Sequence, residues 1–184
     1  MKGTRVSSRY AKSLLGIAKE QGELEQAYSD MKLISETCEN NKELTLLLKT
    51  PIVKADKKIQ VLDALFSNHI GKLSMRFVQT IARKGRERFL YTIAVEFQNQ
   101  YKVEKNIVTA VVTSAIGLDE TLRKKVLELV KNSVASEVEL IENQDKDLIG
   151  GFIVRLGDKQ VDASIHRKLN DLKKSLSEQF VSDN

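Results

Sequence analysis

The sequence predicts a mainly α-helical protein, in which an N-terminal bundle of six helices is followed by a small C-terminal α+β domain. Two observations support this fold class. Apolar residues recur every three or four positions through residues 1–105, as they do on the buried face of a helix. After residue 105, short β-branched runs alternate with helical segments, which is typical of a small sheet with helices packed on it. The predicted domains are therefore 1–105 and 106–184.

Six segments of the first domain carry apolar residues at helical spacing. In chain order these residues run from Val6 to Ile17, Leu24 to Cys38, Leu44 to Leu48, Ile59 to Phe66, Leu73 to Ile81 and Leu90 to Tyr101. Breaks fall at Gly22, before Pro51 and near Gly85, where glycine or proline interrupts the helical pattern. Short connections between the segments favour an antiparallel bundle.

The second domain is predicted to have the element order β-α-β-β-α. The run NIVTAVVTSA is β-branched and alternating, which indicates a strand. A helix follows, for which Asp119 is a plausible N-cap. The predicted elements are strand 106–115, helix 118–134, strands 137–143 and 148–157, and helix 162–180.

The net charge of +5 is unevenly distributed. Residues 1–105 contain 19 lysines and arginines against 12 acidic residues, while residues 106–184 contain 11 against 13. A basic half and a mildly acidic half indicate two units that bind different partners. A basic half is typical of proteins that bind nucleic acid, and also of proteins that bind an acidic or amphipathic protein segment. The charge alone leaves both open.

Hydropathy and the single cysteine further indicate what class of protein this is. No apolar run approaches the roughly 20 residues that cross a bilayer, so no direct membrane insertion is expected. The basic N-terminus lacks the apolar core of a signal peptide, and we expect the protein to stay where it is made, in a bacterium or an organelle that encodes it. Cys38 keeps the helical spacing of Met31 and Ile34, which predicts a small core residue.

The stretch LIGGFIVRLGDKQVDAS, residues 148–164, contains enough glycine to suggest a phosphate-binding loop. Such a loop needs a glycine, four residues and then Gly-Lys-Ser/Thr, and a dinucleotide site needs G-x-G-x-x-G. Neither pattern occurs. We therefore interpret the stretch as structural, with a bulge or close backbone approach at Gly150 and Gly151, a hairpin turn at Gly157-Asp158, and a helix start at Asp162 and Ser164.

Side chains for chemistry are not grouped in this sequence. His69 and His166 fall in different domains, and neither has a cysteine or paired carboxylates at metal-ligand spacing. No Ser/His/Asp or Cys/His set stands out. We predict no catalytic residue, no cofactor and no metal, and therefore that the protein is not an enzyme.

Two helices of the bundle carry more apolar surface than one core face requires. The inward residues of the second helix cover an arc of roughly 120°, whereas those of the first cover roughly 180° and those of the fifth roughly 200°. In the fifth helix, Leu73, Phe77 and Ile81 form one stripe, while Met75, Val78 and Ala82 form another. A surplus stripe is typical of a helix that binds a partner helix. The fourth helix is also broad, so the arcs nominate candidates without selecting a pair.

The whole chain resembles the delta subunit family of F-type ATP synthases, which is related to the mitochondrial oligomycin-sensitivity-conferring protein. The similar segments, in order, are RYAKSLLGIAKEQGELE, LLLKTPIVKADKKIQVLDALF, IARKGRERFLYTIAVEFQNQY, VTAVVTSAIGLDE and LIGGFIVRLGDKQVDASIHRKL. The last segment is the most specific, because the family signature there contains Gly150, Gly151, Gly157, Asp158, Asp162, Ser164 and Leu169. Ala163 stands where the family frequently has glycine.

The resemblance implies a non-catalytic stator subunit in the peripheral stalk of a proton-translocating ATP synthase, which couples rotation to ATP synthesis. Residues 1–105 would cap the catalytic head by binding the N-terminal helix of an alpha subunit between the first and fifth helices. Residues 106–184 would hold the C-terminal ends of the b subunits. The isolated protein would be a monomer, and the complex would place it on the cytoplasmic side of a bacterial inner membrane.

Candidates for the site that binds the alpha subunit come from the two broad arcs. They are Tyr10, Ala11, Leu14 and Ala18 in the first helix, and Met75, Phe77, Val78 and Ala82 in the fifth. The cations Arg76, Arg83 and Arg86 would steer an acidic partner. As a stator subunit, the protein would not bind nucleic acid. The alternative hypothesis is a basic helical RNA-binding module, and the third is a nucleotide-binding enzyme.

Overall fold

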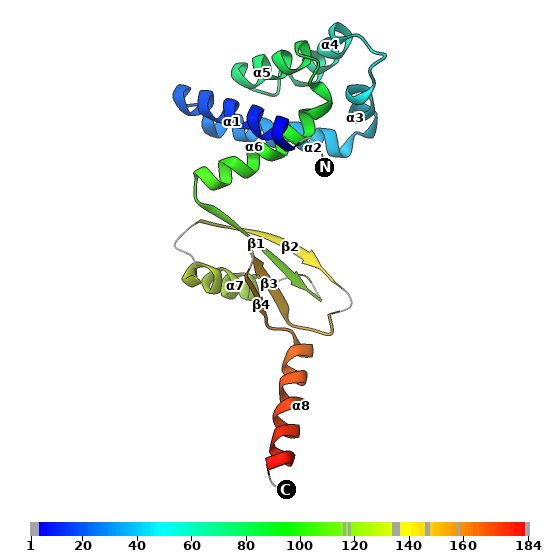
Figure 1. Cartoon of the computed structure of the whole chain (residues 1–184). Coiled ribbons are helices and arrows are strands. Elements are labelled where there is room, and N and C mark those ends of the chain that lie inside the picture. Colours follow the sequence, from blue (N-terminus) through cyan, green and yellow to red (C-terminus); the bar gives the residue numbers. More distant parts are fainter. Residues whose placement is uncertain are drawn as a thin grey trace. The chain divides into compact units, whose positions relative to one another are not determined.

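A computed structural model describes residues 4–115, 117, 119–133, 137–145, 148–157 and 159–182. The chain divides into two compact units, Met1–Glu104 and Lys105–Asn184. The first unit is helical, and the second combines a four-stranded sheet with two helices (Figure 1). The predicted fold class is confirmed.

The first unit contains the six predicted helices. They are α1 (Thr4–Gln21), α2 (Leu24–Asn40), α3 (Lys42–Lys49), α4 (Ala55–Phe66), α5 (Lys72–Arg83) and α6 (Leu90–Glu104), with a short 3₁₀ turn, η1 (Glu87–Phe89), before α6. Gly22 and Gly85 follow α1 and α5 with φ of 72° and 65°, a conformation that glycine adopts without steric cost. Asn41 begins α3, since its side-chain oxygen accepts a hydrogen bond from the Leu44 amide at 3.0 Å.

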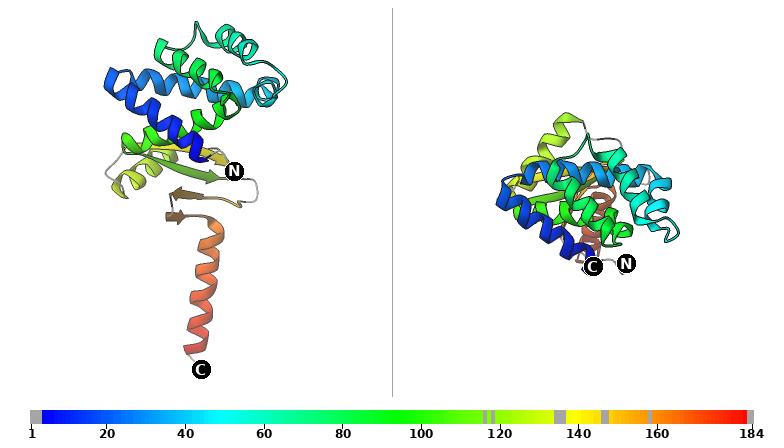
Figure 2. Two further views of the ribbon diagram at one scale, coloured as in Figure 1. Left: turned by 45° about the horizontal axis from the view of Figure 1, so that its top comes forward. Right: turned by 90° about the horizontal axis from the view of Figure 1, so that it is seen from above.

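The core of this unit lies where α6 packs against both α1 and α2, and where α4 packs against α5 (Figure 1, Figure 2). Fully buried side chains come from every one of these helices, and they include Leu14, Met31, Ile34, Leu62, Phe66, Val78, Ile81, Ile93 and Phe97. Cys38 is also buried, and its burial raises the pKa of the thiol to about 11. The prediction that Cys38 is a core residue is confirmed.

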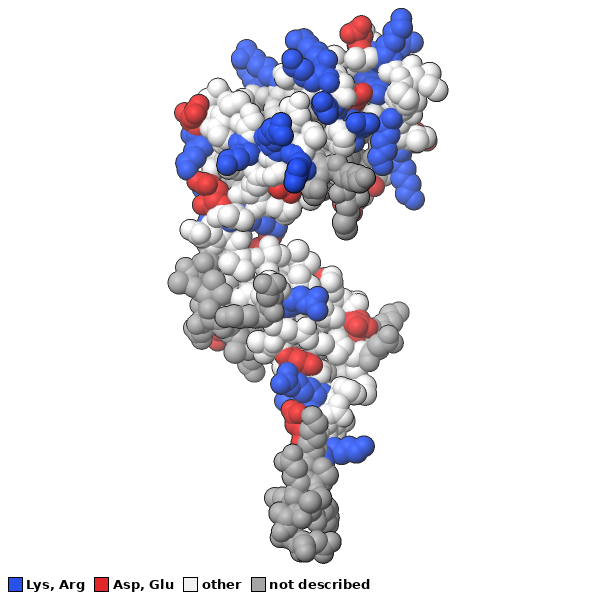
Figure 3. All heavy atoms as spheres, viewed as in Figure 1, with Lys and Arg blue, Asp and Glu red and all other residues white. Residues whose placement is uncertain are grey.

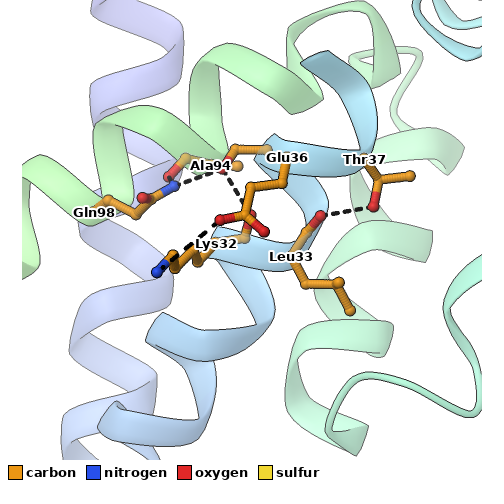
Figure 4. A network of polar contacts seen from close by, with 7 residues as sticks. Lys32, Leu33, Glu36, Thr37, Ala94 and Gln98 are labelled. Atoms are coloured by element: carbon orange, nitrogen blue, oxygen red, sulfur yellow. Dashed lines mark hydrogen bonds and ion pairs between the residues drawn. The ribbon is translucent and has the colours of Figure 1, made fainter. Parts of the chain in front are cut away.

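Polar contacts at the edge of the core fix how these helices meet. Gln98 of α6 donates to the Ser35 hydroxyl of α2 at 2.8 Å and also to the Ala94 carbonyl of its own helix (Figure 4). Asp30 of α2 is buried and accepts from the Gly71 amide at 2.9 Å, at the start of α5. Because a buried carboxylate is costly unless it is hydrogen-bonded, Asp30 ties the α4–α5 connection to α2.

The second unit is built on one sheet. Its elements are β1 (Ile107–Ser114), α7 (Glu120–Ser133), β2 (Glu137–Gln144), β3 (Phe152–Leu156), β4 (Lys159–Asp162) and α8 (Ile165–Ser182). The strand order is β2-β1-β3-β4, with β1 and β2 parallel and the other pairs antiparallel. The strand β4 is absent from the predicted order. It is four residues long, and it pairs with β3 across the turn at Gly157, which has a φ of 56°.

One face of the sheet forms the core of the second unit. Ala110 and Val112 of β1 and Val154 of β3 are buried together with Val126 and Val130 of α7. From Ala110 onward every second residue of β1 is buried, as the two-residue period of a strand requires. This unit has a smaller buried cluster than the helical bundle, and none of the apolar side chains described for α8 belongs to it.

Candidate partner-binding sites

The glycine-rich stretch forms a tight junction between β3 and the start of α8. A Cβ atom on Gly151 would lie 2.4 Å from the Ala163 carbonyl oxygen and 2.9 Å from Ser164 Cα, and the φ of Gly151 is 81°. A Cβ atom on Gly150 would lie 2.6 Å from Ile165 Cδ1. Gly151 therefore needs to be glycine because the backbone at the start of α8 crosses directly against it, whereas the contact at Gly150 is with the end of a side chain.

Hydrogen bonds hold this junction in place. The amides of Ala163 and Ile165 donate to the carbonyls of Phe152 and Gly150 at 2.9 and 3.0 Å. Asp162 accepts from the Ser164 amide at 2.9 Å, and hydrogen bonds from the Ser164 side chain and backbone lower the pKa of the Asp162 carboxyl. The buried Ser164 hydroxyl accepts from the Arg167 amide at 3.2 Å, which makes Ser164 the N-cap of α8.

Most of the described family-signature residues thus serve to form the fold. Gly150, Gly151, Asp162 and Ser164 build the junction, and Gly157 makes the β3–β4 turn. Asp158 lies outside the described residues. Leu169 is different, because it sits on α8 with 55% of its surface exposed.

Leu169 belongs to an uncovered apolar stripe on α8. Ile165, Leu169 and Leu172 are spaced four and three residues apart, so they lie on one side of the helix. They are 43%, 55% and 58% exposed. Exposed basic side chains flank the stripe, including Arg167, Lys168 and Lys173. We call the three apolar residues the α8 stripe; it has the composition of a helix face that binds another helix.

The structure corrects most of the candidates for the site that binds the alpha subunit. Five of them are 0% exposed: Ala11, Leu14, Ala18, Val78 and Ala82. These five residues are core, because the broad arcs of α1 and α5 are filled by neighbouring helices of the same chain. The prediction that Val78 belongs to a surplus stripe is therefore wrong. Met75 lies one turn before Gln79, whose amide donates to Asp63 of α4 at 2.9 Å, so this flank of α5 faces α4.

Tyr10 and Phe77 are the two candidates that meet at a partly exposed surface. Their rings contact edge to face, with centroids 6.5 Å apart and an interplanar angle of 68°, and both side chains are partly exposed. On α1, Val6, Tyr10 and Ile17 share one flank, and Ile17 is 39% exposed. On α5, Leu73 is one turn before Phe77. We call Val6, Tyr10, Ile17, Leu73 and Phe77 the α1–α5 surface.

A pocket of about 330 Å³ adjoins the α1–α5 surface. It is lined by Val6, Arg9, Tyr10, Ser13 and Arg86, and we call it the arginine pocket. Lysine and arginine side chains also cover much of the viewed face of the bundle (Figure 3). Of the three arginines predicted to steer a partner, Arg86 lines this pocket, whereas Arg76 and Arg83 do not.

Arg86 is held at this place by a buried ion pair that sequence reasoning missed. Glu87, the next residue, turns inward and accepts from Lys58 Nζ at 2.6 Å, with side chains only 12% and 3% exposed. Lys58 Nζ also donates to the Leu48 carbonyl at 3.1 Å. Because Glu87 is anchored inward, Arg86 and Arg88 on either side of it are exposed. The helical spacing of Lys58 with the buried Leu62 is the signal that could have revealed the pair.

Among the described residues, no group of three histidine, cysteine, aspartate or glutamate side chains is placed to hold a metal ion. Nor is any described helix both long enough and apolar enough to span a bilayer. The features that the structure does bring together are two partly apolar surfaces edged by cations, one on each unit.

Comparison with solved structures defines the class of the fold. The chain superposes on a chain of the mitochondrial ATP synthase hexamer of Toxoplasma gondii with a TM-score of 0.71, covering 92% of this chain and 96% of that one, at 22% sequence identity. The fold is therefore one that occurs in a mitochondrial ATP synthase.

Sequence comparison gives the family. The family model described as ATP synthase delta (OSCP) subunit matches residues 6–176. The chain is 37% identical to ATP synthase subunit delta of Cytophaga hutchinsonii, over 99% of this chain and 100% of that protein. It is 34% identical to the same subunit of Christiangramia forsetii, over 97% and 96%. The chain belongs to the ATP synthase delta (OSCP) subunit family.

Family membership confirms the resemblance and decides between the functional hypotheses. The chain is a peripheral-stalk component of an ATP synthase and a peripheral part of that membrane-bound complex. Members of the family are structural stator subunits and not enzymes. The RNA-binding hypothesis is not supported by any of these matches.

Proposed function

We propose that the chain joins the catalytic head of the ATP synthase to its membrane-anchored stalk. The α1–α5 surface binds the N-terminal helix of an alpha subunit, and the second unit, through the α8 stripe, holds the C-terminal ends of the b subunits. The isolated protein is a monomer. In the complex it lies on the cytoplasmic side of a bacterial inner membrane, a placement supported by its bacterial relatives.

The Tyr10–Phe77 pair carries the first half of this proposal. A ring pair that is partly exposed in the isolated chain gains buried area when a partner covers it. Val6 and Ile17 extend the apolar strip along α1, which gives it the length that an amphipathic helix needs. The cations at its edge suit a partner whose other faces are acidic.

The α8 stripe carries the second half. Three apolar side chains about half exposed on one helix face are the seam expected of a helix that packs against another helix. The b subunits are the stalk component that the family resemblance implies for this end of the chain.

The first half is tested with a synthetic peptide from the N-terminus of the cognate alpha subunit, titrated calorimetrically into the full-length chain. Ile17→Asp places a charge in the proposed contact, and Leu33→Asp is the matched control, since Leu33 is 37% exposed on α2. We expect Ile17→Asp to weaken binding at least tenfold, about 1.4 kcal/mol or more, and Leu33→Asp to leave it unchanged. Equal effects of the two variants would exclude the α1–α5 surface.

The second half is tested by co-purification with a soluble segment from the C-terminal ends of the b subunits. Leu172→Asp should abolish capture, while Val103→Asp, at a 76% exposed residue of α6, should not. Retention of capture by the Leu172→Asp variant, with normal circular dichroism, would remove the α8 stripe from the contact.

A further inference from the structure

The spacing of the α8 stripe is that of a coiled-coil seam. Ile165, Leu169 and Leu172 are separated by four and then three residues, and the sequence of the same helix continues with Leu176, four residues further on. Alternating steps of four and three keep apolar residues on the contact line of two helices that wind around each other, at positions a and d of a heptad repeat. The described side chains of the stripe are between 43% and 58% exposed, so much of this line faces solvent.

Lysines border this seam on both sides. At roughly 100° per residue, Lys168 lies about 60° to one side of Ile165 and Lys173 about 80° to the other side, which are positions g and e of the heptad repeat. Both side chains are exposed, and neither forms an ion pair within the described part of the chain. Arg167 and Asp171, on the far side of the helix, pair with each other at 3.8 Å. The two lysines beside the seam are thus available to a group outside α8.

These lysines disfavour a second copy of the chain as the occupant of the stripe. In a parallel pair of identical helices, position g of one helix faces position e of the following heptad in the other, so Lys168 would face Lys173 on both sides of the seam. In an antiparallel pair, g faces g and e faces e, so lysine again meets lysine. Like charges at these positions weaken pairing, whereas acidic residues on the other helix strengthen it.

We propose that α8 forms one strand of a two-stranded coiled coil with a helix that carries acidic residues at its own e and g positions, and that Lys168 and Lys173 select this helix over a second copy of the chain. The identity of the occupant rests on the proposed function, which takes it from the C-terminal ends of the b subunits. The inference adds the kind of pairing and the charge that the occupant must carry. It also explains how an exposed apolar stripe is compatible with a monomeric chain.

The pairing is tested first without the b subunits, by mixing two forms of the full-length chain. The double variant Lys168→Glu, Lys173→Glu keeps the apolar seam and reverses the charge of both flanks, so it presents the acidic helix that we propose. In sedimentation equilibrium at low salt, the mixture of wild-type and variant chains should associate at least about tenfold more strongly than either chain alone, and high salt should remove the difference. A mixture no more associated than its separate components overturns the coiled coil.

A matched control separates the seam from general charge attraction. The double variant Arg155→Glu, Arg167→Glu makes the same change in net charge at two exposed positions away from the seam. Mixed with the wild-type chain, it should associate no more than the wild-type chain does alone. Association equal to that of the Lys168→Glu, Lys173→Glu mixture would show that net charge, and not the seam, brings the chains together, and would overturn the proposal.

The second measurement uses the soluble segment from the C-terminal ends of the b subunits. We expect Lys168→Glu, Lys173→Glu to weaken its binding to the full-length chain about tenfold, and Arg155→Glu, Arg167→Glu to leave it unchanged. If both double variants weaken binding equally, or neither does, charge selection by the two lysines is overturned while the contact with the α8 stripe stands. Absence of binding to the wild-type chain would instead overturn the proposed function.

Discussion

The two terminal helices, α1 and α8, are equally long but are buried differently. Each has 18 residues and carries apolar residues at helical spacing. In α1 the stripe of Ala11, Leu14 and Ala18 is completely buried, because α2 and α6 of the same chain cover it. In α8 the stripe of Ile165, Leu169 and Leu172 is about half exposed. Amphipathicity shows that a helix face is meant to be covered, but the same pattern occurs whether the cover comes from the chain itself or from a partner.

The largest expected effect comes from placing a charge in the covered face of the bundle. Val78→Asp puts a carboxylate at a position that is 0% exposed, so we expect it to lower the free energy of unfolding of the first unit by about 4 kcal/mol or more. Leu169→Asp, on the uncovered stripe, should change stability by about 0.5 kcal/mol or less. Urea unfolding followed by circular dichroism measures both. Equal destabilisation would mean that α8 is covered within the chain.

A second variant tests the buried ion pair that holds η1 in the bundle. Lys58→Ala leaves the Glu87 carboxylate buried without its cation, and we expect a loss of about 3 kcal/mol. The double variant Lys58→Met, Glu87→Gln removes both charges and should recover most of that loss in the same urea unfolding measurement. A double variant as unstable as Lys58→Ala would show that the loss comes from packing around Lys58 rather than from the unpaired charge.

The third variant probes the junction before α8. Gly151→Ala adds a Cβ atom against the Ala163 carbonyl and strains a positive φ, so we expect it to destabilise the second unit by about 2 kcal/mol. Gly157→Ala shares the positive φ but meets no atom within 4 Å, and it should cost about 1 kcal/mol. Thermal unfolding of the two variants separates the clash from the strain. If Gly151→Ala loses no more stability than Gly157→Ala, then Gly151 is required for its backbone conformation alone and not to avoid the clash.

Gly16→Ala should have a small effect of opposite sign. With free space around the added methyl group, alanine is expected to stabilise the bundle by about 0.5–1 kcal/mol. Chemical denaturation measures this gain, with Ser13→Ala, at another exposed position of α1, as the comparison. A destabilised Gly16→Ala variant would show that Gly16 serves packing inside the chain.

The sequence predicted where the helices lie more reliably than it predicted what packs against each helix face. Periodicity located all six helices of the bundle, because each buries one face in a common core. The same periodicity could not assign Val78, since the width of an apolar arc on α5 does not say whether another helix of the chain or a partner lies against it. The charge of Lys58 by itself predicts a solvent-exposed side chain. In the structure Lys58 is buried one turn before Leu62.

Local sequence signals identified the junction at the family signature but not the residues at which the neighbouring helix and strand begin. The glycines and the Asp162–Ser164 pair marked the junction, yet α8 begins at Ile165 rather than Asp162, because Asp162 and Ser164 form the cap outside the helix. The strand β4 could not be predicted because four residues, of which Val161 is 57% exposed, carry almost no alternating pattern. Edge strands of this length are stabilised by pairing with their neighbour rather than by their own sequence.

Hydrogen exchange of the full-length chain, alone and with a soluble segment from the C-terminal ends of the b subunits, compares α1 and α8 most directly. We expect the backbone amides of α1 to be strongly protected in both samples, since its stripe is already buried. The amides of α8 should exchange faster in the free chain and become protected at least tenfold when the b segment is added. Protection of α8 equal to that of α1 in the free chain, or no change on adding the segment, would contradict the claim that a partner completes the second unit.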